Sequence, residues 1–267
     1  SIARHHITLM LGSPTIFMGL MGYEGFAQAD LTSLRLCSSG SSALAEDTLR
    51  RWETATGCTV CEGYGQTEAG PVLAYNPYHG HRKLGSVGLA VPQTEIQIVD
   101  VHDGSKVLAL GEVGEIRARG PQIMSEYFRR PVETAEALRD GWLYTGDIGY
   151  LDADGYLTIC DRKKELVIVS GFNVYPREIE EVLFRHPNVS EAAVVGVPDD
   201  YRGEVLVAYV VAQGTAVSSD DVFDYLARHL VKYKWPARIV WVAQLPKTPV
   251  GKVDKKQIRE MAAQVPG

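Results

Sequence analysis

The chain has 267 residues, of which 45% are hydrophobic and 22% are charged, and its formal net charge is −6. This composition is typical of a globular protein with a sizeable core, and it excludes the strongly basic faces of nucleic-acid-binding proteins. No apolar run approaches the length of about 18 residues that a membrane span needs, and residues 1–10 lack the layout of a signal peptide. We therefore predict a cytoplasmic protein without a transmembrane segment, and we leave peripheral attachment to a membrane open.

The first part of the chain has the pattern of an α/β sheet. Residues 34–39, LRLCSS, are typical of a short buried strand, and residues 43–57 have the pattern of a helix that ends at Gly57. Residues 58–65, CTVCEGYG, predict a second strand that runs into a glycine-rich loop. Ligands of α/β sheets usually bind at the edge where such loops gather, so we expect a site there.

The next segment is richer in short strands. The alternating segments 94–100 and 114–120 indicate a β-rich subdomain, and residues 147–161 predict a hairpin whose turn is DADG.

The cysteines offer two interpretations. The sequence has four of them, Cys37, Cys58, Cys61 and Cys160. Cys58 and Cys61 have metal-like spacing, but no second pair answers them, and we favour core or strand positions for both. A redox pair of the thioredoxin type is the weaker alternative, because Cys58 follows the glycine that ends a predicted helix.

The composition changes at residues 161–165, DRKKE, and the pattern then restarts as a smaller unit. Pro176 stands where a helix would begin, and residues 191–197 and 204–211 read as strands. Ser218 and Asp221 form a predicted capping box before another helix. We place a domain boundary at Asp161, which gives domains at residues 1–160 and 161–267.

Residues 62–70, EGYGQTEAG, carry candidate chemistry. A threonine hydroxyl can donate to a phosphate oxygen, and the neighbouring carboxylate of Glu68 can bind Mg²⁺. Tyr64 offers a flat ring for a base. Glycines often allow something to approach the backbone closely. Taken alone, this stretch fits a polar turn with a buried tyrosine equally well.

Six motifs in order decide between these interpretations. They are SSGSSAL (38–44), EGYGQTEAG (62–70), GEIRARGPQIMSEYF (114–128), GWLYTGDIG (141–149), DRKKELVIVSGFNVYPREIE (161–180) and PKTPVGKVDKK (246–256). Together they resemble the adenylate-forming superfamily, which includes acyl-CoA and aryl-CoA synthetases, luciferases and peptide-synthetase adenylation domains. The string GFNVYPREIE is similar to the long-chain fatty-acid–CoA ligase branch.

The resemblance implies an AMP-forming acid–thiol ligase that uses ATP, Mg²⁺ and coenzyme A to activate a fatty or other hydrophobic carboxylic acid. It implies catalytic roles for Lys252, Thr67 and Glu68, with Glu68 also the metal ligand. It implies that the following residues bind the nucleotide or CoA: Gly40, Ser41, Ser42, Glu62, Gly63, Tyr64, Gly65, Thr67, Asp147, Arg162, Ser170, Gly171 and Lys252. Asp147 would accept hydrogen bonds from the ribose, and Gly171 would let the pantetheine pass.

The resemblance also implies an incomplete enzyme. Residues 1–160 are similar to the end of the large AMP-binding domain, with mixed sheets and a β-rich subdomain. Residues 161–267 are similar to the small mobile α+β domain, with a solvated hinge at Asp161. The family's upstream phosphate loop is absent, so we expect the missing N-terminal portion to be a partner. Two alternatives stay open: delivery of the acyl group to a carrier-protein thiol, and an inactive fragment. Homo-oligomerisation is also left open.

Overall fold

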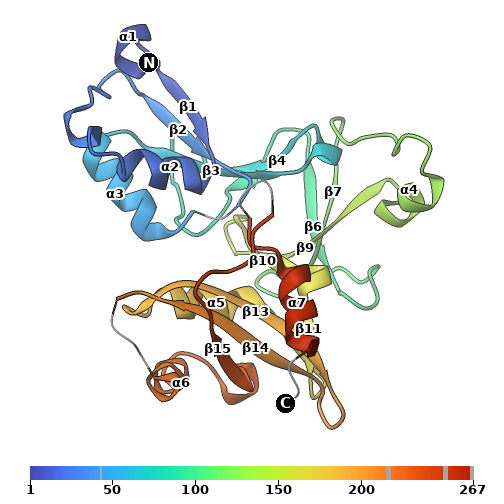
Figure 1. Cartoon of the computed structure of the whole chain (residues 1–267). Helices are drawn as coiled ribbons and strands as arrows, with labels where there is room; N and C mark the ends of the chain where they lie inside the picture. Colours follow the sequence, from blue (N-terminus) through green and yellow to red (C-terminus); the bar gives the residue numbers. More distant parts are fainter. Residues whose placement is uncertain (43, 215–217, 249–251, 265–267) are drawn as a thin grey trace. The chain divides into compact units, whose positions relative to one another are not determined.

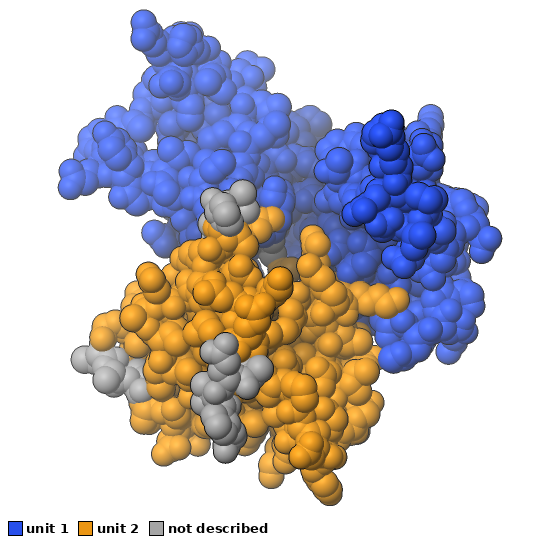
Figure 2. Space-filling model, turned by 45° about the vertical axis from the view of Figure 1, so that its right-hand side comes forward, with its two compact units in different colours: residues 1–159 blue, residues 160–267 orange. Residues whose placement is uncertain are grey.

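The computed structural model describes residues 1–42, 44–214, 218–248 and 252–264 (Figure 1). The chain divides into two compact units, residues 1–159 and residues 160–267, which Figure 2 shows in separate colours. The division falls inside strand β10 (Leu157–Arg162). Both units combine helices with sheets, so the predicted α/β class is confirmed.

The elements of unit 1 follow in chain order as α1 (Ile2–His5), β1 (Leu9–Gly12), α2 (Pro14–Met21), η1 (Phe26–Gln28), β2 (Leu36–Ser39), α3 (Glu46–Thr56), β3 (Val60–Gly65), η2 (Thr67–Ala69), β4 (Val72–Tyr75), β5 (Leu89–Ala90), β6 (Glu95–Val99), β7 (Gly114–Arg119), α4 (Pro131–Ala137), β8 (Leu138–Arg139), β9 (Trp142–Leu151) and β10.

The first sheet of unit 1 has the order β1-β2-β3-β4-β5. Strands β1, β2 and β3 are parallel, and β4 and β5 extend the sheet in antiparallel fashion. Phe17 from α2 and Leu49 and Trp52 from α3 pack with Cys37 and Val60 of the sheet. Because β2 and β3 are parallel, the residues that follow them emerge at one edge of the sheet.

The second sheet of unit 1 has the order β10-β9-β7-β6, and β8 pairs with β9. Its β6–β7 and β7–β9 pairs are antiparallel, in agreement with the predicted β-rich subdomain. Leu73 and Ala74 of β4 pack against Ala118 and Ile116 of β7, so the two sheets share a core. This packing carries the residues after β3 towards those of the second sheet.

Most element predictions in unit 1 are confirmed, with shifted ends. Helix α3 stops at Gly57 as predicted: its last residue is Thr56, and Gly57 is the C-cap, with a φ of 68° in the left-handed region that favours glycine. The helix begins at Glu46 rather than at residue 43. Strands β9 and β10 form the predicted hairpin, and Asp152 in its turn accepts the amides of Asp154 and Tyr156. Residues 58–65 were predicted as a strand that runs into a loop, and the structure has a strand, β3, that begins at Val60 and continues through Gly65.

The cysteine prediction is also confirmed. Cys37, Cys58 and Cys61 are buried, and the Sγ atoms of Cys37 and Cys58 lie 3.5 Å apart. Burial raises the pKa of the Cys37 thiol to about 12, so this thiol stays protonated near neutral pH. These residues therefore serve as small apolar core residues.

The elements of unit 2 follow β10 as η3 (Lys163–Glu165), β11 (Val167–Val169), β12 (Phe172–Val174), α5 (Pro176–Phe184), β13 (Val189–Asp199), β14 (Gly203–Ala212), α6 (Ser219–Ala227), η4 (Lys232–Lys234), β15 (Arg238–Trp241) and α7 (Lys255–Gln264).

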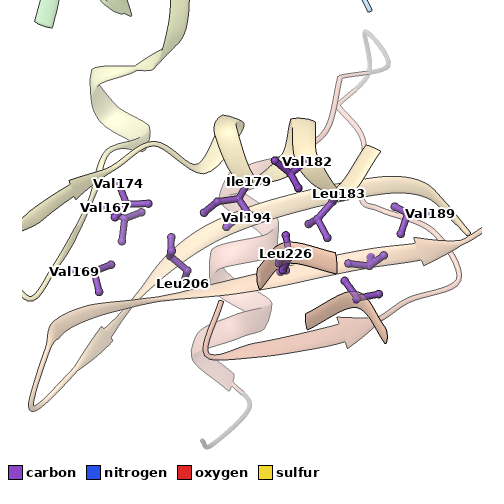
Figure 3. Packing of buried hydrophobic residues seen from close by; sticks show 14 residues of the cluster. Val167, Val169, Val174, Ile179, Val182, Leu183, Val189, Val194, Leu206 and Leu226 are labelled. Carbon is purple, nitrogen blue, oxygen red and sulfur yellow. The ribbon is translucent and has the colours of Figure 1, made fainter. Parts of the chain in front are cut away.

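The sheet of unit 2 has the order β12-β11-β14-β13, and β15 pairs in parallel with β14. One face packs Val194 and Leu206 against Ile179 of α5 and Leu226 of α6 (Figure 3). The other face packs alternate residues of the same strands, such as Val195, against α7. Both faces are covered, which explains why β13 and β14 read as almost continuous apolar runs.

The predicted capping box in unit 2 is confirmed. The Ser218 hydroxyl accepts the amide of Asp221, and the Asp221 carboxylate accepts the amide of Ser218. Within the described part of the chain, no helix is both long and apolar enough to cross a bilayer.

Candidate functional site

The candidate site in unit 1 begins where β2 and β3 end side by side. Ser39 of β2 is the register partner of Glu62 in β3, and Gly40 follows Ser39 directly. A Cβ atom on Gly40 would lie 3.8 Å from the carbonyl oxygen of Gly63, so the two predicted glycine stretches adjoin. Ser41 and Ser42, which are exposed, continue from this point.

Glu62 stabilises this edge of the sheet through a hydrogen bond. Its side chain is buried, and its Oε1 accepts the amide of Leu44 at 3.1 Å. A buried carboxylate needs such partners, because desolvation of the charge is costly. The bond ties the segment after β2 to β3, and the expected role of Glu62 in nucleotide binding stays a prediction.

In the EGYGQTEAG motif, Gly65 is required by the packing of the backbone. A Cβ atom on Gly65 would lie 1.8 Å from the carbonyl oxygen of Pro71, and the amide of Gln66 donates to that same oxygen at 2.8 Å. The motif was expected to be an open loop that admits a ligand to its backbone. Instead, Glu62–Gly65 belong to β3, and the close neighbour of Gly65 is the returning backbone. This packing closes the turn that presents Thr67 and Glu68.

Tyr64 and Asp147 meet although 83 residues separate them. The Tyr64 hydroxyl donates to Oδ2 of Asp147 at 2.7 Å. Asp147 lies within strand β9, and only 6% of it is exposed. The structure therefore places the predicted base platform next to the predicted ribose acceptor.

Glu68 has a partner that the sequence analysis did not single out. Tyr127 donates its hydroxyl to Oε1 of Glu68 at 2.8 Å. Burial first, and then this bond, raise the pKa of Tyr127 to about 12, so the phenol keeps its proton. Thr67, beside Glu68, is exposed. The tyrosine belongs to the string SEYF, but 59 residues separate it from Glu68, and no sequence pattern indicates that the two side chains meet.

The carboxylate of Glu68 is chemically suitable as a magnesium ligand. Among the described residues, no group of three or more His, Cys, Asp or Glu side chains could hold a metal ion without help. Mg²⁺ commonly binds through one or two carboxylates together with substrate phosphates, so a single half-exposed carboxylate is a suitable donor set.

In unit 2, Ser170 and Gly171 form the tip of the β11–β12 hairpin. Val169 and Phe172 are register partners, and φ is 49° at Ser170 and 83° at Gly171. Two positive φ values in a two-residue hairpin turn are the pattern of a type I′ turn, which favours glycine. A Cβ atom on Gly171 would meet no atom within 4 Å among the described residues, so the tip is open.

Lys252 and Arg162 are exposed residues of unit 2. The Lys252 backbone bonds twice to Thr248: its carbonyl accepts the Thr248 amide at 2.7 Å, and its amide donates to the Thr248 hydroxyl at 3.2 Å. Part of the PVGK string that precedes the lysine lies outside the described residues. Arg162 ends strand β10.

Asp161 is not the solvated residue that the sequence suggested. It is buried, its Oδ1 accepts the amide of Arg162 at 2.7 Å, and its Oδ2 accepts the amide of Arg177 at 2.9 Å. Arg177 is in the first turn of α5, where the helix dipole favours a negative charge. The carboxylate therefore caps a helix within unit 2. The hinge role of Asp161 stays a prediction.

Comparison with known proteins identifies the family. The family model of AMP-binding enzymes matches residues 1–128, and the model of the AMP-binding enzyme C-terminal domain matches residues 178–252. A long-chain-fatty-acid–CoA ligase of Salmonella typhimurium is 42% identical over 261 residues, which are 98% of this chain and 46% of the relative. This chain thus spans about half the length of the curated relatives it matches.

Two solved structures are similar over nearly the whole chain. ATP-bound MatB from Rhodopseudomonas palustris has a TM-score of 0.86 and 38% identity, covering 96% of this chain and 51% of that one. O-succinylbenzoate coenzyme A synthetase from Bacillus subtilis, in complex with AMP, has a TM-score of 0.84 and 34% identity, covering 97% of this chain and 52% of that one. The chain therefore belongs to the AMP-binding enzymes of the adenylate-forming superfamily.

Proposed function

We propose that this chain is part of an enzyme that activates a carboxylic acid with ATP and transfers the acyl group to coenzyme A. The contact between Tyr64 and Asp147, beside the turn that presents Thr67 and Glu68, carries this proposal. Tyr64 supplies a flat ring, Asp147 an acceptor for ribose hydroxyls, and Glu68 a carboxylate that can bind magnesium. An ionised carboxylate accepts hydrogen bonds and donates none, which suits a ribose with two hydroxyl donors.

In the first step, a carboxylate oxygen of the acid attacks the α-phosphorus of ATP. A bond forms between these two atoms, the bond from the α-phosphorus to the bridging oxygen breaks, and pyrophosphate leaves. Thr67 would contact a phosphate oxygen, and the ammonium of Lys252 would stabilise the negative charge that gathers around the phosphorus. Magnesium bound at Glu68 would add positive charge at the phosphates.

In the second step, the thiol sulfur of CoA attacks the acyl carbon. A carbon–sulfur bond forms, AMP leaves with the anhydride oxygen, and the thiol proton passes to solvent. Gly171 would lie beside the pantetheine, since a residue without a side chain leaves room at the hairpin tip. Rotation about Asp161 would bring Lys252 into use for the first step and Gly171 for the second.

The fatty-acid–CoA ligase names of the curated relatives support a fatty or other hydrophobic acid and CoA as the acceptor. We further propose that an upstream portion of the same protein completes the enzyme, as the length of the relatives suggests. Leu11 of the edge strand β1 is 69% exposed, and Ile16 and Met18 of α2 are 47% and 49% exposed. A group of exposed apolar side chains on an edge strand and its neighbouring helix is typical of a surface that another segment covers.

The isolated chain of 267 residues is expected to show no acid-dependent exchange between ATP and pyrophosphate. The full-length enzyme, meaning this chain with its upstream portion, should show exchange with hydrophobic acids and should then form the CoA thioester. Radioactive pyrophosphate exchange measures the first step, and parallel assays with CoA and with a holo carrier protein identify the acceptor. Robust exchange by the isolated chain would contradict the incompleteness, and absence of exchange in both proteins would contradict the proposed function.

Asp147→Ala in the full-length enzyme is expected to weaken ATP binding by about 1.5–3 kcal/mol for each hydrogen bond lost to the charged acceptor. Tyr64→Phe is the matched control, because it keeps both the ring and the carboxylate and removes the hydroxyl that donates to Asp147. Calorimetry without turnover gives the affinities. Equal ATP affinity in Asp147→Ala and the unmodified enzyme would refute the ribose assignment.

A further inference from the structure

The segment from Gln122 to Tyr127 encloses the turn that carries Glu68. The amide of Met124 donates to the Glu68 carbonyl at 2.8 Å, and the side-chain amide of Gln122 donates to the Val72 carbonyl at 3.2 Å. A Cβ atom on Gly70 would lie 2.8 Å from the Gln122 carbonyl oxygen, so the two segments are in close contact. The backbone position of Glu68 is therefore set by a segment more than fifty residues later in the chain.

The same segment also holds the Glu68 side chain. The Tyr127 hydroxyl donates to Oε1 of Glu68 at 2.8 Å. Tyr127 is itself anchored, because its amide donates to the Thr134 hydroxyl at 3.0 Å, and that hydroxyl donates to the Arg130 carbonyl at 2.7 Å at the start of α4. These two hydrogen bonds hold the backbone of Tyr127 in place, and therefore fix the position from which its side chain extends.

Glu68 is half-buried rather than buried, so tight packing of the surrounding residues does not by itself fix the rotamer of its side chain. Ordering a glutamate side chain costs conformational entropy, and a ligand that meets a mobile carboxylate must supply the free energy for this ordering. A phenol bonded to one oxygen offsets the cost before the ligand arrives and leaves the other oxygen as an acceptor.

We propose that Tyr127 is a positioning residue, whose hydroxyl orders the Glu68 carboxylate so that this carboxylate can bind the magnesium ion of an incoming nucleotide. The inference rests on the proposed function, because it takes Glu68 as the magnesium-binding carboxylate. It adds to the site a residue that acts through the carboxylate of Glu68.

The test measures how much magnesium strengthens ATP binding in the full-length enzyme, without turnover. Calorimetry gives the ATP affinity with Mg²⁺ and with chelator, and their ratio is the magnesium gain. Tyr127→Phe is expected to lower this gain by roughly 3–10-fold, the effect of one lost hydrogen bond. Glu68→Gln should lower it further. The double variant should match Glu68→Gln, because two changes that act through one carboxylate are not additive.

Two further variants separate positioning from general damage. Tyr144→Phe is the matched control: it also removes a tyrosine hydroxyl from the same unit, one bonded to the Gly104 carbonyl and Arg117, and it should leave the gain unchanged. Thr134→Val removes the anchor of Tyr127 but keeps its phenol, and it should lower the gain less than Tyr127→Phe. Metal-free AMP affinity should be equal in all five variants if Tyr127 acts through Glu68 alone.

The outcomes distinguish the two proposals. If Glu68→Gln removes the magnesium gain and Tyr127→Phe retains it, the positioning role is wrong and the proposed function stands. If the effects of Tyr127→Phe and Glu68→Gln add in the double variant, Tyr127 acts elsewhere and the positioning role is again wrong. If the unmodified full-length enzyme binds no ATP, both proposals fail.

Discussion

Lys252→Ala in the full-length enzyme is expected to slow adenylate formation by about 10²–10³-fold or more, which is the loss typical of one preorganised donor. The same variant, given synthetic acyl-adenylate and CoA, should form the thioester at nearly the normal rate. The two half-reactions therefore need separate measurement, by pyrophosphate release and by thioester formation.

The reason for this separation is where the charge develops. Adenylation gathers negative charge around the α-phosphorus, and an ammonium group placed there stabilises the transition state more than the ground state. The thiol attacks at the acyl carbon, so the second step does not require an ammonium group at the α-phosphorus. Lys252 is exposed, and its backbone is fixed to Thr248 by two hydrogen bonds, so its long side chain extends from an anchored position.

Lys256→Ala is the matched control for this experiment. Lys256 is also an exposed lysine of unit 2 and lies only one turn further along the chain, in α7. Its loss should leave both half-reactions unchanged. If Lys252→Ala slows both half-reactions equally, or slows neither, then Lys252 is a structural or solvated charge and its catalytic assignment is wrong.

Gly171→Trp is expected to give the opposite result. Thioester formation from synthetic acyl-adenylate should fall by roughly 10²-fold or more, the cost of misplacing a reactant by about 1 Å. Adenylate formation should be nearly normal. A Cβ atom on Gly171 would meet no described atom within 4 Å, so a side chain can be attached there without a clash at Cβ, and we expect the indole to occupy the proposed pantetheine path.

Backbone strain must be separated from blocking, because φ at Gly171 is 83°. A side chain in the left-handed region costs about 1–2 kcal/mol. Gly214→Trp is a suitable control, since Gly214 also lies in unit 2, with φ of 76° and no described atom within 4 Å of its Cβ. It should carry similar strain without slowing the thiol step. Equal loss of thioester formation in both variants would show that strain, rather than a blocked path, is responsible.

The sequence by itself determined the features that depend on neighbours along the chain. The end of α3 at Gly57 follows from the freedom of glycine in the left-handed region, and the capping box at Ser218 and Asp221 follows from a bond across three residues. The DADG turn is local in the same way. The family was also predictable, because the order of six motifs is a property of the sequence alone.

Only the tertiary structure decided which distant residues meet. The bond from Tyr64 to Asp147 and the bond from Tyr127 to Glu68 join strands and turns that lie 83 and 59 residues apart in the sequence. No periodicity or spacing encodes such a pair, because it depends on how β4 and β7 pack in a shared core. Tyr127 was missed for this reason.

Burial also depended on the tertiary structure, and it changed the expected surroundings of two residues. Gly65 was expected in an open loop, but the space that a side chain would take is filled by the backbone at Pro71. Asp161 was expected to be solvated because it stands in the polar string DRKKE, but its carboxylate is buried and caps α5. The binding role of Gly65 and the hinge role of Asp161 stay predictions. A polar or glycine-rich string shows that a segment can be exposed to solvent or can adopt unusual backbone conformations. What fills the surrounding space is determined by segments far away in the chain, because close packing and the bonding of buried polar groups are satisfied for the whole fold together.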